Sequence, residues 1–467
     1  MLWRMSQRMF RWAGIAALLV LMTRVTYLAA QPLSNADTWF HLRLGHDLGA
    51  PWTWSDPPQW STFATAHWVP TQPLADVVMA GAEDVGGLPA VAWLYGVGLL
   101  VFLLTLYGIC RSQASPLVAA LGVCAATIGA SGSLSARPQL VSLILVPLVV
   151  HIWLCTEHDG RARWWLIPLS WLWAMCHGFW IVGVAVGFAV VAGMVIGGSV
   201  RGRDAARLVM VPVGSLIAAA LTPVGPGLLL TPFAVNDRSA LISEWQRASF
   251  GSIEPWPAAV MIVLAAVLLG SRRRLTTAQA LLLGMALVGI FLNGRTVTLS
   301  GLIAVPLFVR AVQMGVSFPI ASESRRVELR RLWVAGAAMA AVLAVMVPHL
   351  AEHSDKTPAF ESRLSAVREG GTVLTDPTAG SWLVWQHPQI NVTVDGLFDA
   401  YPVDYLRRSS GAILARSGWE SYVAEVDPSL AVLEAQDPLV DALRASGWLL
   451  EESSGGYVLL APTRSSQ

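Results

Sequence analysis

The stretch Asn35-Ala36-Asp37-Thr38-Trp39-Phe40-His41 places a carboxylate and an imidazole directly after the first hydrophobic run, before the chain becomes apolar again near Leu88. Ionisable groups at a membrane boundary are costly unless they are solvated or used, so we expect chemistry in this loop. The apolar runs on either side of it decide the fold.

The composition is that of a membrane protein. Of 467 residues, 55% are hydrophobic and only 13% are charged, and the mean hydropathy is +0.56. These values exclude an ordinary soluble enzyme. The net charge of +1 gives no sign of a nucleic-acid partner. The partner that the composition does predict is the lipid bilayer.

Near-continuous apolar runs predict about eleven transmembrane helices, since about 20 apolar residues are needed to cross a bilayer. The first run lacks a small-residue cleavage site, so we interpret it as a retained span rather than a removed signal peptide. The predicted fold class is therefore mainly α, a polytopic transmembrane bundle. The runs lie near 11–31, 88–110, 116–134, 138–156, 163–177, 178–198, 206–223, 255–270, 276–293, 297–314 and 332–350.

Basic residues predict the orientation, because short cytoplasmic loops carry an excess of Lys and Arg. Alternate loops are rich in arginine, from Arg4, Arg8 and Arg11 before the first span to Arg325, Arg326, Arg330 and Arg331 before the last. The opposite loops hold far fewer basic residues. This pattern predicts a cytoplasmic N-terminus, an odd number of spans and an extracytoplasmic C-terminal region.

Three segments on the predicted outer side are too long to be turns, namely 32–87, 224–254 and 351–467. We expect residues 1–350 to form one helical domain that carries the first two segments as external loops. A helical pattern runs from Asp37 to Leu48. Tryptophans in the same loop suit either an interfacial aromatic belt or stacking on sugars; they are Trp39, Trp52, Trp54, Trp60 and Trp68.

The C-terminal segment, 351–467, has the composition of a soluble protein and predicts a small extracytoplasmic α/β domain. Short β-like runs occur at 372–375, 392–394, 430–433 and 457–460. Helical patterns at 359–368, 403–416 and 439–445 alternate with them. The segment is long enough to have a core of its own.

Ionisable residues near the span ends gather on the predicted outer side, as an active site at one end of a helical bundle requires. A carboxylate there can deprotonate an acceptor hydroxyl while arginines hold a phosphate bidentately, which suits transfer from a phosphate-linked lipid. The residues are Asp37 and His41 after the first span, and Arg137, His177, Glu244 and Arg295 in later loops.

Four of these residues also have a purely structural interpretation. Asp37 could cap the helix that begins there, and His41, one turn later, could simply pair with it. Arg137 could be an interfacial residue whose head reaches the membrane surface. His177 could be a hydrogen-bonded histidine at a helix end.

The two remaining residues differ in how far their neighbourhood constrains them. Glu244 could pair with Arg238 or Arg247 on a solvated loop, a kind of pair that means little. Arg295 lies in a turn too short to solvate it freely, which favours an anionic partner.

Short motifs follow one another along nearly the whole chain: Asp37-x-x-x-His41, Gly45, Pro73-Leu74-Ala75-Asp76, Arg137-Pro138, Trp173 to His177-Gly178, Thr222-Pro223-x-Gly225, Glu244-Trp245, Asn293-Gly294-Arg295 and Val394-Asp395-Gly396. This order resembles a group of bacterial integral membrane proteins similar to the GT-C glycosyltransferases. That superfamily includes the oligosaccharyltransferase catalytic subunit and the protein mannosyltransferases. In it, an Asp of the first external loop is the catalytic carboxylate, and the donors are polyprenyl-phosphate-linked sugars.

The resemblance implies that Asp37 is the catalytic carboxylate. We predict that Asp37 acts as the general base, with His41 as its orienting partner. Arg137 and Arg295 would form the phosphate clamp, and His177, Glu244 and Trp245 would be further substrate-binding groups. Many relatives carry a second acidic residue near the first, whereas this chain has Asn35. Asp76 or Glu244 would have to supply the second carboxylate. The resemblance therefore leaves a requirement for a divalent metal, Mg²⁺ or Mn²⁺, open.

The function predicted from these observations is that of an inverting GT-C-like glycosyltransferase in the bacterial plasma membrane. It would transfer a sugar from a polyprenyl-phosphate donor to an envelope glycan, lipid or protein at the outer face. A transporter or flippase of a lipid-linked precursor is an alternative, although that class needs polar groups at mid-membrane depth. A non-catalytic scaffold for envelope assembly is another, because fold does not imply function.

Overall fold

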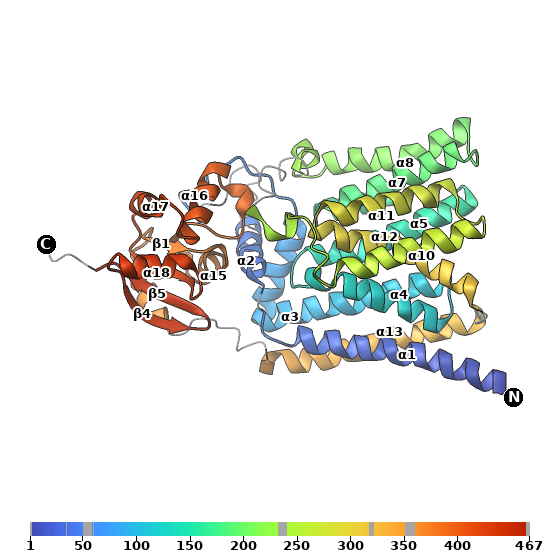
Figure 1. Cartoon of the computed structure of the whole chain (residues 1–467), viewed down its shortest axis with the longest axis horizontal. Coiled ribbons are helices and arrows are strands. Elements are labelled where there is room, and N and C mark those ends of the chain that lie inside the picture. The colour runs from blue at the N-terminus through green and yellow to red at the C-terminus, as the bar shows by residue number, and fades with distance from the viewer. Residues whose placement is uncertain are drawn as a thin grey trace. The chain divides into compact units, whose positions relative to one another are not determined.

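The computed structural model describes residues 2–33, 35–49, 58, 60–231, 241–316, 322–350 and 360–463. The chain divides into two compact units (Figure 1). The helical unit comprises Met1–Gln31, Pro89–Leu229 and Ser243–Leu350, and the mixed unit comprises Pro32–Leu88, Leu230–Ile242 and Ala351–Gln467. The mixed unit thus combines the C-terminal segment with the first predicted external loop. The domain boundary expected near residue 350 stays a prediction.

Each of the predicted spans coincides with a helix. These helices are α1 (Leu2–Ala29), α3 (Pro73–Arg111), α4 (Pro116–Gly129), α5 (Gln139–Asp159), α6 (Leu166–Ala174), α7 (Trp180–Ile196), α8 (Gly202–Ala220), α10 (Pro255–Ser271), α11 (Thr277–Leu292), α12 (Gly294–Gly315) and α13 (Ser322–Leu350).

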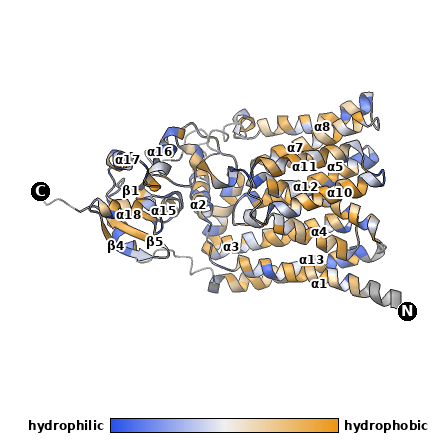
Figure 2. Cartoon of the chain, viewed as in Figure 1, coloured by the Kyte–Doolittle hydropathy of each residue, from blue (hydrophilic) through white to orange (hydrophobic). Residues whose placement is uncertain are grey.

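Five of these helices, α1, α3, α5, α12 and α13, are long and apolar enough to cross a membrane. Four others, α4, α7, α10 and α11, are apolar but have only 14 to 17 residues. Hydrophobic residues run along the helices of the helical unit, and polar residues gather near their ends (Figure 2). The chain is therefore a mainly helical, multi-span membrane protein, and the number of eleven spans stays a prediction.

α12 is the most enclosed of the five long apolar helices, with 83% of its most apolar window buried. It packs against α4, α5, α10 and α11. Its first residue is Gly294, so this packing also holds Arg295, in the first turn, in place.

α3 starts earlier than the sequence predicts. The apolar run begins near Leu88, whereas the helix begins at Pro73 and is interrupted by non-helical Gly86 and Gly87. The segment 73–85 carries several acidic side chains, so a search for apolar runs passes over it. Gly87 has a φ of 65°, a left-handed conformation that glycine adopts without strain. The glycine pair lies just before the point where α3 passes from the mixed unit into the helical unit.

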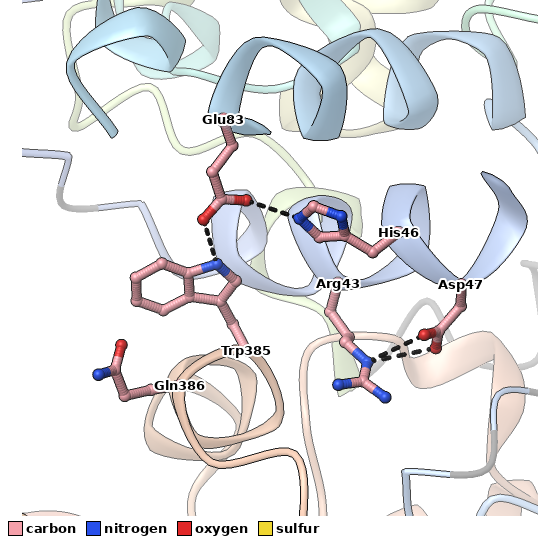
Figure 3. A pocket seen from close by; sticks show the side chains of 6 residues that line it. All are labelled: Arg43, His46, Asp47, Glu83, Trp385 and Gln386. Carbon is pink, nitrogen blue, oxygen red and sulfur yellow. Dashed lines mark hydrogen bonds and ion pairs between the residues drawn. The ribbon is translucent and has the colours of Figure 1, made fainter. Parts of the chain in front are cut away.

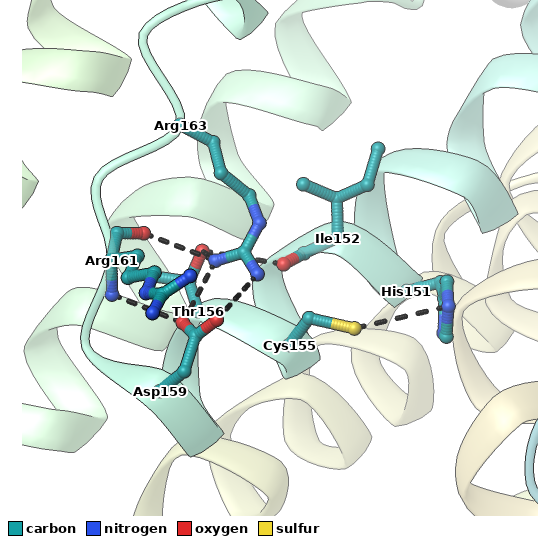
Figure 4. A network of polar contacts seen from close by, with 7 residues as sticks. All are labelled: His151, Ile152, Cys155, Thr156, Asp159, Arg161 and Arg163. Atoms are coloured by element: carbon teal, nitrogen blue, oxygen red, sulfur yellow. Dashed lines mark hydrogen bonds and ion pairs between the residues drawn. The ribbon is translucent and has the colours of Figure 1, made fainter.

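An arginine network closes the loop after α5 (Figure 4). Arg163 Nη2 lies 2.9 Å from Asp159 Oδ2, and Arg163 Nη1 donates to the buried Thr156 Oγ1 at 2.7 Å. The backbone N–H of Arg161 donates to Asp159 Oδ1 at 3.0 Å. Arg163 thus has a structural role at the end of α5.

The mixed unit contains a five-stranded sheet of order β2-β1-β3-β5-β4. β1 (Thr372–Thr375) pairs in parallel with β2 (Asn391–Val392) and β3 (Leu430–Glu434). β5 (Tyr457–Ala461) pairs antiparallel with β3 and with β4 (Leu449–Ser454). Four of these strands fall at the predicted β-like runs. The sequence prediction misses β4, because this edge strand is polar and largely exposed.

The helices of the mixed unit confirm three of the C-terminal helical predictions and add two more. α14 (Glu361–Leu364), α16 (Val403–Ile413) and α18 (Pro438–Ala445) lie where helices are predicted, whereas α15 (Pro377–Gln386) and α17 (Trp419–Val426) are not predicted. The small mixed α/β domain is confirmed.

α2 (Ala36–Gly49) confirms the helix expected in the first external loop. It packs against α15. Trp52, Trp54 and the 232–240 part of the second external segment lie outside the described residues.

Candidate functional site

α2 begins with a side-chain cap, and the residue that provides it shows whether Asp37 caps the helix. The Oδ1 of Asn35 accepts a hydrogen bond from the backbone N–H of Asp37 at 3.0 Å. The cap of the helix is therefore Asn35, and Asp37 lies inside the first turn. A carboxylate is favoured there by the partial positive charge of the helix N-terminus. The Asn35 that departs from the family pattern thus has a local structural role.

His41 lies one turn after Asp37 on the same helix face and pairs with a residue of α3. Its Nδ1 is 2.9 Å from Asp76 Oδ1, and the two side chains are 4% and 0% exposed. The amide of Gln72 lies 3.4 Å from the imidazole nitrogens. Burying a carboxylate is costly without a partner, so the imidazole stabilises it. Asp76 Oδ2 is also buried and has no hydrogen-bond partner among the described residues.

The contact between His41 and Asp76 depends on the close approach of α2 and α3. A Cβ atom at Gly45 would lie 2.1 Å from the backbone oxygen of Asp76. Only glycine fits at such a distance, which gives a physical reason for the Gly45 of the sequence motif.

A second cluster lies in the helical unit, where one carboxylate joins two arginines. Arg137 Nη1 is 2.9 Å from Glu244 Oε1, and Arg295 Nε is 2.7 Å from Glu244 Oε2. Arg137 precedes α5, Glu244 lies in the short helix η4 (Ser243–Trp245), and Arg295 lies in the first turn of α12. Two guanidinium groups thus share one carboxylate in this cluster. No ion pair joins Glu244 to Arg247 among the described residues, and the other expected partner, Arg238, lies outside them.

The surroundings of Arg295 hold it on this cluster. Asn293 Oδ1 accepts from the N–H of Thr296 at 2.9 Å, and Thr296 Oγ1 accepts from the N–H of Asn293 at 3.1 Å, which forms a capping box. The guanidinium of Arg295 lies 5.2 Å from the ring centre of Trp245, a cation–π distance. The N–H of Gly294 donates to the carbonyl of Gln246. The Asn-Gly-Arg motif is therefore a helix start that aims an arginine.

His177 is held through its Nδ1 atom in the turn between α6 and α7. Trp173 Nε1 can only donate, and it donates to Ser142 Oγ at 2.7 Å. Ser142 Oγ lies 3.0 Å from His177 Nδ1, and the backbone N–H of Phe179 donates to the same atom at 3.3 Å. Nδ1 is therefore an acceptor, so Nε2 carries the ring proton. The structural interpretation of His177 as a hydrogen-bonded histidine is confirmed.

The Val394-Asp395-Gly396 stretch forms a buried turn of the mixed unit. Asp395 accepts from the N–H of Leu397 at 2.6 Å and from the Tyr401 hydroxyl at 2.7 Å. Burial raises the pKa of Asp395 to about 6. The N–H of Gly396 donates to Ser381 Oγ at 2.8 Å.

The sequence-predicted residues thus form two contact groups. His41 and Asp76 meet in the mixed unit, where Asp37 shares the His41 face of α2, and Arg137, Glu244, Trp245 and Arg295 meet in the helical unit. His177 contacts Ser142 and Phe179.

Sequence reasoning missed a polar pocket of the mixed unit (Figure 3). Arg43, His46 and Asp47 line it from α2, and Glu83, Trp385 and Gln386 complete it. A signal was present in the sequence: the three α2 residues are spaced i, i+3, i+4, and so form a polar stripe on one face of a helix.

The fold is shared with solved glycosyltransferases. An archaeal oligosaccharyltransferase, AglB from Archaeoglobus fulgidus in complex with an inhibitory peptide and a dolichol-phosphate, matches 97% of this chain and 74% of its own at 13% identity and a TM-score of 0.57. ArnT from Cupriavidus metallidurans matches 97% of this chain and 98% of its own at 12% identity and a TM-score of 0.53. The arabinofuranosyltransferase AftD from Mycobacteria matches 98% of this chain and 42% of its own at 14% identity and a TM-score of 0.51.

The resemblance to GT-C glycosyltransferases is therefore confirmed at the level of the fold. No family model matches the chain, and no curated protein matches it.

The metal requirement was tested on the residues themselves. A further structure of AglB is a complex with Zn and sulfate, at 13% identity and a TM-score of 0.51, and covers 89% of this chain and 68% of its own. In the described part of the present chain, no group of three or more His, Cys, Asp or Glu side chains could hold a metal ion. The described residues therefore show no metal site, and the Mg²⁺ or Mn²⁺ left open by the resemblance stays a hypothesis.

Proposed function

We propose that this protein is a GT-C-type glycosyltransferase that takes a sugar from a polyprenyl-phosphate-linked donor and transfers it to a cell-envelope acceptor at the outer face of the membrane. The observation that carries the proposal is the meeting of Arg137 and Arg295 on the single carboxylate of Glu244. The fold shared with three glycosyltransferases supports it.

The arginine pair suits the phosphate of a lipid donor. Guanidinium groups bind phosphate oxygens in a bidentate way. The terminal amino groups of Arg295 make no hydrogen bond to another described residue, and they remain available to an anion. The two guanidinium groups would also stabilise the negative charge that develops on the leaving phosphate.

The mixed unit would supply the base. Asp37 takes the proton of the acceptor hydroxyl, the acceptor oxygen bonds to the anomeric carbon, and the bond from that carbon to the phosphate oxygen breaks. The phosphate leaves with the electron pair, so the anomeric configuration inverts. His41 would orient Asp37 from one turn away, and the buried Asp76 holds the imidazole of His41.

His177 would be a further substrate-binding group. Ser142 and the backbone N–H of Phe179 hold its imidazole at Nδ1. The reaction so written uses only side chains of this chain.

Native mass spectrometry of the protein purified in mild detergent tests the proposal. The wild type should carry a polyprenyl phosphate or polyprenyl-phosphate sugar, whose mass identifies the sugar, and Arg295→Ala should lose it. A matched control is Arg363→Ala, which removes an arginine from an exposed ion pair with Glu451 in the mixed unit. This variant should keep the lipid.

Two outcomes would overturn the proposal. One is a wild-type protein that carries no such lipid even after incubation with polyprenyl phosphate. The other is a bound lipid that responds to Arg363→Ala as strongly as to Arg295→Ala. Lipid that binds and crosses vesicle membranes without sugar transfer would favour the flippase.

A further inference from the structure

We propose that the pocket lined by Arg43, His46, Asp47, Glu83, Trp385 and Gln386 is a saccharide-binding subsite of the mixed unit, separate from the His41–Asp76 pair. The ligand class is a neutral, hydroxyl-rich sugar. The role of the subsite in holding the glycan of the acceptor rests on the proposed function. Its ability to bind a sugar does not.

The pocket has the size and origin of a ligand site. Its volume is about 410 Å³, within the range of roughly 300–1,000 Å³ that small-molecule sites occupy. Three elements of one unit form it: α2, the first part of α3, and α15 (Figure 3). On α2 these residues lie on a different face from the buried His41, so one helix serves two sites.

Internal contacts hold the lining without using up its hydrogen-bonding capacity. Glu83 Oε1 accepts from Trp385 Nε1 at 2.7 Å, and Glu83 Oε2 lies 3.1 Å from His46 Nε2. A carboxylate has about four acceptor positions, so about two remain on Glu83. Arg43 uses only its Nε toward Asp47, at 3.1 Å from Oδ1.

Several donors of the pocket remain available. The terminal amino groups of Arg43 and the exposed amide of Gln386 make no hydrogen bond to another described residue, and Figure 3 draws none for them. The pocket therefore presents donors and acceptors together. A sugar hydroxyl is both a donor and an acceptor, so a polyol matches this set, whereas an anion matches only the donors.

The charge of the pocket also favours a neutral ligand. The lining has one arginine, Arg43, and two carboxylates, Asp47 and Glu83. Asp84 Oδ1 adds a further carboxylate 3.7 Å from His46 Nδ1. A net negative lining repels phosphate and carboxylate ligands, which distinguishes this pocket from the Arg137–Arg295 cluster.

The indole of Trp385 gives the pocket an aromatic surface that suits a sugar ring. Trp385 is partly exposed, and its ring centre lies 4.8 Å from that of the buried Trp39, which holds the indole in place. Trp60 Nε1 donates to Asp47 and fixes the opposite side. A rigid indole beside polar groups offers an apolar surface for the C–H face of a pyranose while its neighbours bind the hydroxyls.

Saturation-transfer NMR on the full chain in detergent tests the subsite, with neutral disaccharides of glucose, galactose and mannose as probes. At least one should bind, and Gln386→Ala and Glu83→Gln should each weaken binding about tenfold. Trp385→Ala should abolish it, and Trp385→Phe should keep the packing on Trp39 and part of the binding. The matched control is Gln436→Ala, an exposed glutamine of the same unit.

Each contrary result has a defined meaning. If none of the probes binds the wild type, the subsite does not exist as proposed. The same follows if Gln386→Ala and Gln436→Ala have the same effect on sugar binding. Both glutamines are exposed, so misfolding of a variant cannot explain that equality. If inorganic phosphate displaces the sugars, the pocket is an anion site. A wild-type protein that carries no polyprenyl phosphate in native mass spectrometry, even after incubation with it, but still binds the sugars would overturn the proposed function and leave this subsite standing.

Discussion

The two charged clusters of this chain use similar groups but differ in how far water reaches them. Glu244, which joins Arg137 and Arg295, is 33% exposed in its side chain, whereas Asp76, which pairs with His41, is 0% exposed. A partly solvated ion pair can exchange one partner for a ligand at low cost. A buried pair cannot, because separation leaves an uncompensated charge. The first cluster is therefore suited to binding, and the second to holding a geometry.

The largest effect we predict is on turnover in Asp37→Asn. Sugar transfer should fall by about 10²–10⁴-fold, the usual contribution of a general base. The measurement is the release of free polyprenyl phosphate from membrane-extracted lipid-linked sugars, followed by mass spectrometry. The lipid itself should still co-purify with this variant, since the arginine cluster is intact.

Asp441→Asn, a change at an exposed residue of α18, serves as the control for Asp37→Asn and should turn over at the wild-type rate. Near-normal turnover in Asp37→Asn would show that Asp37 is not the general base. The assignment of the base to the mixed unit and of phosphate binding to the arginine cluster would then be wrong.

The next prediction concerns stability. His41→Ala leaves the Asp76 carboxylate buried without its partner, so it should destabilise the packing of α2 on α3 by about 3 kcal/mol. Hydrogen exchange of peptides from 36–49 and 73–85 in the full chain measures this opening. Adding Asp76→Asn to His41→Ala should recover part of the loss, because no buried charge then remains.

The exposed pair of Arg363 and Glu451 gives the contrast to His41→Ala. Arg363 is 46% exposed, and Arg363→Ala should cost less than about 1 kcal/mol. Equal costs in the two variants would mean that burial does not distinguish them.

A smaller effect is expected at the solvated cluster. Glu244→Gln removes the carboxylate that competes with phosphate for Arg137 and Arg295, so polyprenyl phosphate should bind about tenfold more tightly. Titration by native mass spectrometry measures the affinity. Glu254→Gln, in the same unit, should leave it unchanged. Weaker binding in Glu244→Gln would show that Glu244 positions the arginines rather than occupying the place of the anion.

Much of the fold could be predicted from sequence because it depends on local patterns. Apolar runs locate the helices of the helical unit, and short β-like runs locate four of the five strands. α15 was harder to predict, since its sequence contains Gly380 and several residues that favour other structures, and tertiary packing on α2 decides its state. The polar 73–85 part of α3 was missed because hydropathy does not separate a polar helix from a loop.

The site was less predictable, because its contacts join residues far apart in the chain. The sequence indicates Asp37, His41 and Arg295 as candidates by position. It cannot show that His41 meets Asp76, or that Glu244 meets Arg137 across more than one hundred residues, since these contacts depend on helix packing. Gly45 was among the motifs, yet only the 2.1 Å approach of a Cβ atom to α3 explains it.

The last prediction concerns Asp437, a carboxylate with one buried oxygen. Asp437, before α18, has an Oδ2 that is buried and has no partner among the described residues. Burial and the neighbouring Asp376 and Glu434 raise its pKa to about 7, from an ordinary value of 3.8. The folded state then binds the proton more tightly than the unfolded state, so this group lowers stability as pH rises from about 4 to 7.

Asp437→Asn removes that dependence, whereas burial still raises the pKa of Asp376 to about 6. At pH 8 the variant should unfold roughly 3 °C higher than the wild type in a thermal scan of the full chain, and the difference should shrink as the pH falls toward 5. The Asp376 carboxyl remains in both proteins, so the comparison at each pH isolates Asp437 and its coupling. A difference in unfolding temperature that is constant with pH would assign the effect to packing. The comparison between Asp437 and Asp76, whose carboxylate is stabilised by the His41 imidazole, would then fail.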